Sequence, residues 1–254
     1  MVTLKTKDEI DKLKYGGKIL AEILRELEKY CQENYSSGEL TTKDVNQKSD
    51  ELLKKNNVLP AFRYAKQPFP TGLCVSINDE VVHGVPGDRI LKEGDLVSLD
   101  LGVIYEKLYT DAAISFILGS NKKTEDEFLI ETTRDSLKKG IEKARVGNTI
   151  GDIGNAIEVC VKESGFKVVR DYCGHGVGYS VHEEPPIPNY GKAGEGIELK
   201  EGMILAIEPM VVMGSPEVYV DKNNWTVKTT DGKRAAHWEH TVAVTAEGPV
   251  VLTE

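Results

Sequence analysis

Hydrophobic residues recur at three- and four-residue spacing in four stretches of the chain, which is the pattern of a helix with one buried face. These stretches predict helices over residues 7–32, 42–56, 125–144 and 150–164. Elsewhere apolar residues alternate or run together between turn-forming residues, as is typical of β-strands. The predicted strands cover residues 73–82, 96–104, 108–118, 167–172, 203–213 and 241–251. We therefore predict an α+β fold, with an antiparallel sheet backed by helices.

The chain also repeats itself. Residues 91–102 read LKEGDLVSLDLG, and 108 positions later residues 199–210 read LKEGMILAIEPM. Residues 41–45 and 149–153 match at the same offset, and both resemble the capping box that opens a helix. The LKEG match alone would fit a common surface turn, but the shared offset argues against chance. We interpret the repeat as a duplication within one domain, because solenoid repeats run only about 20–50 residues.

The repeat places acids on apolar strands in both halves. Asp100 and Glu208 are equivalent, and each is followed by a second acid, Asp111 after eleven residues and Glu239 after thirty-one, so that 20 residues are inserted in the second half. A short hairpin, turned at residues 105–107, would bring the Cβ atoms of the first pair to about 5 Å. Solvated turn carboxylates are the alternative, but the apolar neighbours argue against it. Buried carboxylates cost several kcal/mol unless they are paired or bind metal, so we expect divalent cations.

Histidines complete the candidate site. The glycine-rich segment GHGVGYSVHEEP contains His175 and His182, and one imidazole is expected to join the acids, although either residue fits a structural role as well. His83 in VVHGVP is a third candidate. We interpret His237 and His240 as structural, and neighbouring strand residues such as Glu239 and His240 face opposite sides.

Four carboxylates and one imidazole suit Mn, Fe or Co better than a structural zinc, which favours thiolates. Two such ions about 3.5–4 Å apart lower the pKa of a shared water molecule, which predicts hydrolysis. The ligand pattern leaves a peptide or a phosphate ester open as the substrate.

Bulk properties narrow the function. The chain has 254 residues and a net charge of -9, which argues against DNA binding as its main task. Its four cysteines show no CxxC spacing and predict reduced thiols. There is no signal peptide and no apolar run of membrane-spanning length, so we expect a cytoplasmic protein without a membrane partner.

Six motifs resemble, in order, those of the type I methionine aminopeptidases: CVSINDEVVHGVP, SLDLG, YTDAAISF, GHGVGYSVHEEP, ILAIEPM and WEHTVAV. The resemblance runs from Asp8 to Val251. It implies the pita-bread fold in one catalytic domain, residues 1–254, with pseudo-twofold halves at about 1–120 and 121–254. It also implies removal of the N-terminal methionine from nascent polypeptides when the second residue is small, with two divalent ions of Co, Mn, Fe or Zn.

The resemblance also implies a role for each site residue. Asp100 would bind one ion, His175 and Glu208 the other, and Asp111 and Glu239 would bridge both. Glu208 would also shuttle a proton, His182 would polarise the scissile carbonyl, and His83 would contact the substrate amine or the leaving nitrogen. The methionine pocket would involve Phe69, Cys74, Val181 and Trp225, and Val181 stands where a phenylalanine is usual in the family.

Partners and alternative functions complete the predictions. We expect a monomer, and the cations Lys222, Lys228, Lys233 and Arg234 suggest a transient contact with ribosomal RNA, with a solvated loop as the alternative. Xaa-Pro dipeptidases share the fold and ligands but carry an additional N-terminal domain, which we do not expect because the first helix begins within ten residues of Met1. A non-catalytic peptide-binding homologue would have lost ligands that this chain keeps.

Overall fold

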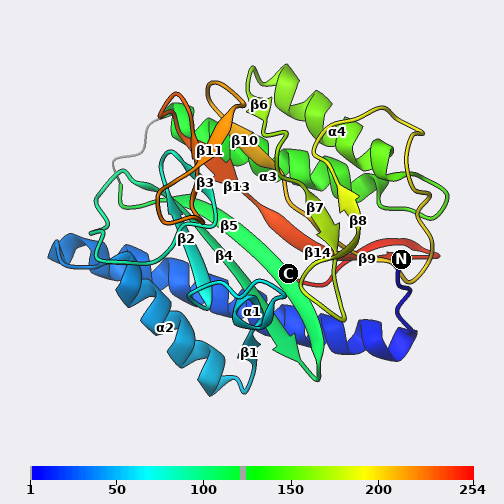
Figure 1. Cartoon of the computed structure of the whole chain (residues 1–254), viewed down its shortest axis with the longest axis horizontal. Coiled ribbons are helices and arrows are strands. Elements are labelled where there is room, and N and C mark those ends of the chain that lie inside the picture. Colours follow the sequence, from blue (N-terminus) through cyan, green and yellow to red (C-terminus); the bar gives the residue numbers. More distant parts are fainter. Residues whose placement is uncertain (1, 121–123) are drawn as a thin grey trace.

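The computed structural model describes residues 2–120 and 124–254, in which four α-helices pack against an antiparallel sheet (Figure 1). The helices are α1 (Lys7–Asn34), α2 (Thr42–Lys55), α3 (Thr124–Lys143) and α4 (Ile150–Glu163), and short 3₁₀ turns cover Tyr35–Ser37 and Ala61–Tyr64. All four predicted helices are confirmed to within two residues at each end. None of the helices in the described ranges combines the length and apolar character that a bilayer crossing requires.

The main sheet has nine strands, in the order β1-β4-β5-β14-β9-β7-β8, with β2 paired to β4 and β15 paired to β14. Two three-stranded sheets, β13-β10-β6 and β11-β12-β3, complete the structure. The first eight strands are β1 (Leu59–Pro60), β2 (Leu73–Ile77), β3 (Glu80–Val82), β4 (Leu96–Tyr105), β5 (Leu108–Ile117), β6 (Lys167–Val168), β7 (Gly174–Gly176) and β8 (Glu183–Ile187). The others are β9 (Ile204–Ile207), β10 (Met210–Val212), β11 (Val218–Val220), β12 (Val227–Thr229), β13 (Ala235–His237), β14 (Glu239–Thr245) and β15 (Gly248–Val251).

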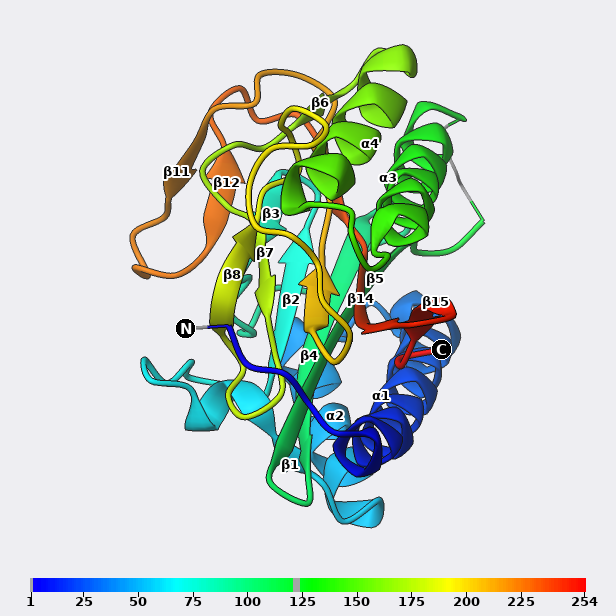
Figure 2. The same ribbon diagram turned by 90° about the vertical axis from the view of Figure 1, so that its right-hand side faces the viewer.

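Each helix pair covers its own part of the sheet. One hydrophobic cluster joins α1 and α2 to β2, β4 and β5, whereas a second joins α3 and α4 to β9 and β14. Figure 1 shows α1 and α2 along the lower side of the molecule and α3 and α4 at its upper right, and the turned view of Figure 2 shows α1 running beside the β4–β5 hairpin. The predicted α+β architecture, an antiparallel sheet backed by helices, is confirmed.

The hairpin between β4 and β5 forms where the sequence predicted it. Its ten paired positions end at a two-residue turn, Glu106-Lys107, whose φ angles of 46° and 69° lie in the left-handed region. Such angles match the twist that two antiparallel strands need in a tight connection. The hairpin thus fixes the register of both acids that it carries.

Four predicted strands are shorter than expected or are interrupted. The run over residues 203–213 breaks at Glu208-Pro209, because proline has no N–H for the ladder. The run over 73–82 turns at Asn78, with φ 61°, and that over 241–251 folds back as the β14–β15 hairpin. Only Lys167–Val168 of the run over 167–172 is a strand. The observed strands in these runs are therefore shorter than the predicted ones.

Candidate functional site

The register of five neighbouring segments lines up the candidate residues across the sheet. Cys74 on β2 pairs with Asp100 on β4, which pairs with Ala113 on β5. Ala113 also pairs with Glu239 on β14, and the next residue, His240, pairs with Ile207, which directly precedes Glu208. The residue between Asp100 and Glu239 in this row is therefore an alanine, whose small side chain leaves space above the sheet for the carboxylates.

Asp111 and His175 lie diagonally to this row. Asp111 pairs with Gly102, two positions along from Asp100, so the two hairpin acids share a face without lying directly opposite. The expected spacing of about 5 Å assumed directly opposite residues, whereas diagonal neighbours lie about 7–8 Å apart, with somewhat less between their Cβ atoms. His175 on β7 pairs with Ala206, two residues before Glu208. Its Nε2 lies 3.5 Å from the Oε1 of Glu208.

Burial of the four acids disfavours their ionised forms and raises the pKa of each. Asp100, Asp111 and Glu239 are 8%, 3% and 2% exposed. Burial, reinforced by the neighbouring carboxylates, raises the pKa of Asp111 and of Glu239 well above the ordinary range. Burial also raises the pKa of Asp100 to about 7 and that of Glu208 to about 8. The protein alone does not offset this cost, since the described residues supply no lysine or arginine ion pair to any of these acids.

The unpartnered oxygens of the acids fit a metal centre. Among the described residues, Asp100 Oδ1, Asp111 Oδ1 and Glu239 Oε1 are buried without a hydrogen-bond partner. Ligand atoms of Asp111, His175 and Glu239 lie within 4.8 Å of one another. Burial lowers the pKa of His175 to about 3, so its imidazole is neutral and able to bind a cation. These donors are the hard set that divalent ions prefer.

His237, interpreted as structural from the sequence, also lies at this centre. Its Nε2 is 3.3 Å from Glu208 Oε2, so Glu208 lies between two imidazoles, and Glu208, His237 and Glu239 form a second group able to hold a cation. The alternation of side chains along a strand could have revealed it, because His237 and Glu239 are two residues apart and share a face. His240 faces away, with Nδ1 2.9 Å from Thr253 Oγ1, and stays structural.

The other two candidate histidines flank the acids. His182, between β7 and β8, has its ring centroid 4.6 Å from that of His175, and burial lowers its pKa. His83 follows β3 and packs edge-on against Tyr172 at 5.9 Å. Burial, with smaller effects from His237 and His182, lowers the pKa of His83 to about 4. Both imidazoles are therefore neutral near pH 7 and can donate one N–H each.

A cavity of about 640 Å³ opens over this centre. Phe69, Cys74 and Trp225 line it, with the Phe69 and Trp225 rings edge-on at a centroid distance of 5.1 Å. Sequence reasoning did not anticipate four further lining residues from the loop before β2, which are Phe62, Ala65, Lys66 and Gln67. Val181 is buried in the apolar cluster with Phe69 and Cys74 and does not line the cavity itself.

Ion pairs neutralise two of the four cations in the predicted basic cluster of Lys222, Lys228, Lys233 and Arg234. Lys228 forms a 2.9 Å ion pair with Asp79, and Arg234 forms one of 2.7 Å with Asp126. Arg234 also donates to the carbonyl of Gly94. These two cations tie their segment to the body of the protein.

Comparison with known proteins matches residues 11–246 to metallopeptidase family M24. The methionine aminopeptidase of Clostridium perfringens is 46% identical over 253 residues, covering 100% of this chain and 99% of that protein. Methionine aminopeptidase 1 of Bacillus subtilis is 42% identical with the same coverage. The crystal structure of methionine aminopeptidase from Thermotoga maritima matches with a TM-score of 0.94 at 43% identity, covering both chains fully.

A prolidase from Pyrococcus horikoshii shares the fold at a TM-score of 0.75, with 22% identity over 99% of this chain and 63% of its own. That likeness concerns the fold alone, and it agrees with the predicted pita-bread architecture, which is confirmed. The family match and the full-length relatives confirm the resemblance found in the motifs. The chain therefore belongs to metallopeptidase family M24 and, within it, to the methionine aminopeptidases.

Proposed function

We propose that the chain removes the N-terminal methionine from nascent polypeptides whose second residue is small, by metal-dependent hydrolysis of the first peptide bond. The observation that carries the proposal is the position of the acids and His175 at the base of a cavity with apolar walls. A methionine side chain fits such walls, because its thioether makes favourable contacts with aromatic rings such as Phe69 and Trp225. The full-length relatives support methionine as the first residue.

The proposed metal centre holds two divalent ions drawn from Co, Mn, Fe and Zn. Asp100 would bind one ion and His175 with Glu208 the other, while Asp111 and Glu239 would contact both. When bound, such ions lower the pKa of a water molecule and polarise a carbonyl oxygen. The buried, unpartnered carboxylate oxygens support this assignment.

The remaining polar side chains would handle protons and the substrate. Glu208, between His175 and His237, is placed to accept a proton from the attacking water and to return it to the leaving nitrogen. The neutral imidazole of His182 would donate its N–H to the carbonyl oxygen as negative charge develops there. His83 would contact the substrate amine or the leaving nitrogen. Cys74 remains a thiol, because burial raises its pKa well above the ordinary value.

A peptide panel tests the proposal. Peptides beginning Met-Ala, Met-Leu and Ala-Pro are assayed for release of the first residue with added Mn, Fe, Co or Zn. We expect methionine release from Met-Ala alone. Release from Ala-Pro would favour the Xaa-Pro peptidase alternative instead. Hydrolysis of no peptide with any metal, together with peptide binding, would favour the non-catalytic homologue.

We also propose one catalytic domain built from two duplicated halves. In support, α2 and α4 both begin with a capping box, at Thr41 and Thr149. These two residues make equivalent bridges, to Ile90 and Glu198, again 108 positions apart. The expected boundary between the halves falls at residues 121–123, which lie outside the described residues.

The expected setting is a monomer in the cytoplasm, and the free state of the four cysteines supports a reducing compartment. A transient contact with ribosomal RNA would depend chiefly on Lys222 and Lys233, because Lys228 and Arg234 are occupied by ion pairs. Sedimentation with ribosomes at low salt is expected to weaken when both lysines are changed to glutamine. Unchanged sedimentation would exclude this contact.

A further inference from the structure

His83 has an unusual backbone conformation. Its φ of 57° lies in the left-handed region, which residues other than glycine rarely adopt. A conformation of this kind is strained and persists only where surrounding contacts determine it. The contacts that hold residues 83–85 therefore decide where the His83 imidazole lies.

Strand β2 holds this loop from one side. The N–H of Gly84 donates to Ser76 Oγ at 3.1 Å, and the N–H of Val75 donates to the Gly84 carbonyl at 2.9 Å. A Cβ atom at Gly84 would overlap the Val75 carbonyl, so only glycine allows this approach. These contacts fix Gly84 and leave the His83 carbonyl and the Val85 N–H to be held from the other side.

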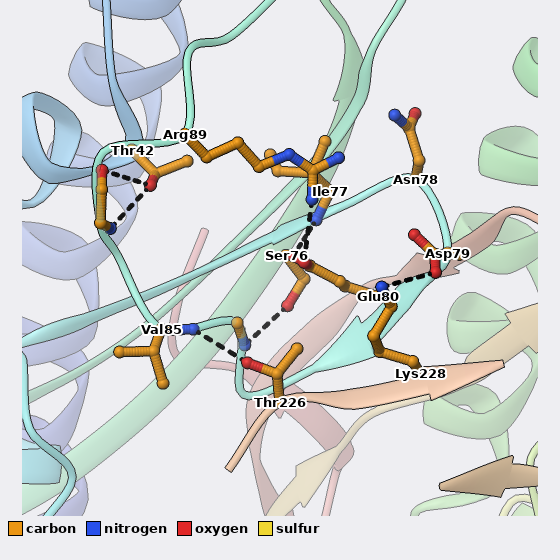
Figure 3. Close-up of polar contacts among 12 residues, drawn as sticks. Thr42, Ser76, Ile77, Asn78, Asp79, Glu80, Val85, Arg89, Thr226 and Lys228 are labelled. Atoms are coloured by element: carbon orange, nitrogen blue, oxygen red, sulfur yellow. Dashed lines mark hydrogen bonds and ion pairs between the residues drawn. The ribbon is translucent and has the colours of Figure 1, made fainter. Parts of the chain in front are cut away.

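Thr226 supplies the contacts on that second side. Its hydroxyl donates to the His83 carbonyl at 3.2 Å and accepts from the Val85 N–H at 3.3 Å, and Figure 3 shows Thr226 beside Val85 and across the loop from Ser76. It also accepts from Asn223 Nδ2 at 2.7 Å. One donated and two accepted hydrogen bonds use the whole capacity of a hydroxyl group. Thr226 is 2% exposed, so water does not replace these contacts.

Thr226 belongs to the residues that lengthen the second half of the chain. It lies between Trp225, which lines the cavity, and β12, which pairs with β3 directly before His83. The Lys228–Asp79 ion pair, visible in Figure 3, attaches the same strand to the turn that begins β3. The hairpin of residues 218–229 is thus anchored against the His83 loop at several points.

We propose that Thr226 is a positioning residue for His83, through which the inserted hairpin sets the place of this imidazole in the active site. The inference rests on the proposed function, because it assigns His83 a contact with the substrate. Thr226→Val keeps the shape of the side chain but removes the donor to His83, and it leaves the Val85 and Asn223 donors without an acceptor. The loop then loses the restraint that holds His83 in its left-handed conformation.

The kinetic test compares five variants with the wild type on a Met-Ala peptide. Thr226→Val is expected to lower kcat/KM about tenfold, the scale of losing the one hydrogen bond that His83 makes to the substrate, with metal content unchanged. Thr226→Ser keeps the hydroxyl and is expected to stay within about twofold of the wild type. Thr229→Val is the matched control, since Thr229 is equally buried on β12 but donates to the Lys233 carbonyl. In a His83→Ala background, Thr226→Val is expected to have no further effect.

A spectroscopic test reports the position directly. The protein has five histidines, so the imidazole C2–H resonance of His83 can be assigned in the NMR spectrum by its loss in His83→Ala. This resonance is expected to shift in Thr226→Val and to stay in place in Thr229→Val. If Thr226→Val does not fold, Thr226→Ala provides the same loss of the hydroxyl group.

Two outcomes would overturn the inference. One is an unchanged His83 resonance and kcat/KM in the folded variant. The other is an equal loss of activity with and without His83, since Thr226 would then act on something else. A wild-type protein that releases no methionine would contradict the proposed function, whereas the resonance shift would still decide whether Thr226 holds His83.

Discussion

Removing the bound metal should make the stability of this protein depend strongly on pH. In the folded chain, burial raises the pKa of Asp100 to about 7 and that of Glu208 to about 8. In the unfolded chain both carboxyl groups have their ordinary pKa near 4. Between these values the metal-free folded state holds protons that the unfolded state has released. These acids therefore lower stability as the pH rises towards 7 or 8. Below about pH 6.5 the buried histidines act in the opposite direction, because burial lowers their pKa and only the unfolded chain holds their protons. The net loss of stability is therefore expected above about pH 6.5.

The size of the effect follows from the number of excess protons. Each proton held by the folded state alone lowers the free energy of unfolding by about 1.4 kcal/mol per pH unit. Asp100 and Glu208 together contribute about 3 kcal/mol per unit between pH 5 and 7, which the buried histidines offset below about pH 6.5. Asp111 and Glu239 act in the same direction, because burial raises their pKa as well. Bound cations keep these acids ionised in the folded state, which removes this slope.

Urea unfolding at pH 6.5, 7.0 and 7.5, above the range in which the histidines offset the acids, measures the effect, with protein stripped by EDTA compared with protein in excess Mn²⁺. We expect the stripped protein to lose stability steadily with pH and the metal-loaded protein to change little over the same range. Stripped Glu239→Gln, which has one acid fewer, should show a shallower slope. A stripped wild-type protein that is equally stable at pH 6.5 and 7.5 would refute the reasoning.

Four substitutions test the centre and its pocket further. Asp111→Ala or Glu239→Ala is expected to abolish turnover and to lower bound metal, because each carboxylate would contact both ions; a variant that keeps two ions and most of its activity would contradict the dinuclear proposal. His182→Ala should keep its fold and metal while kcat falls about 10²–10³-fold, the usual cost of one lost oxyanion donor, and an unchanged kcat would make this residue structural. Val181→Phe adds volume behind the cavity wall and is expected to increase the preference for Met-Ala over Phe-Ala peptides by about 1–3 kcal/mol. An identical ratio of the two kcat/KM values would show that other side chains already fill this space.

Local signals in the sequence were sufficient for much of the fold. The capping boxes at Thr41 and Thr149 place the starts of α2 and α4 because the side-chain and backbone partners are three residues apart. The two-residue turn at Glu106-Lys107 fixes the β4–β5 register in the same local way. Equivalent acids in a repeated segment likewise indicated one shared site before any contact was known.

Contacts between distant segments were not predictable from these signals. Lys66 and Phe62 line the cavity because the loop before β2 folds over the sheet, and no periodic pattern marks such a loop. Val181 was expected in the pocket from the resemblance. Instead, its side chain packs behind the cavity wall, in the apolar cluster that contains Phe69 and Cys74. The direction of a side chain in a loop depends on contacts with residues far away in the chain. Local sequence patterns do not indicate which residues these are.

The inserted hairpin shows how the second half differs from the first. In the first half, Asp100 and Asp111 are joined by a turn of two residues, and a tight turn can offer little to a substrate. The second half has 20 more residues between Glu208 and Glu239. These residues bring Trp225 to the cavity and Thr226 to the His83 loop. The duplicated acids would therefore form most of the proposed metal centre, and the inserted residues would add Trp225 and the support of His83 to a substrate cavity that is otherwise lined largely by the first half. On this view, shortening the hairpin should spare metal binding and destroy selectivity.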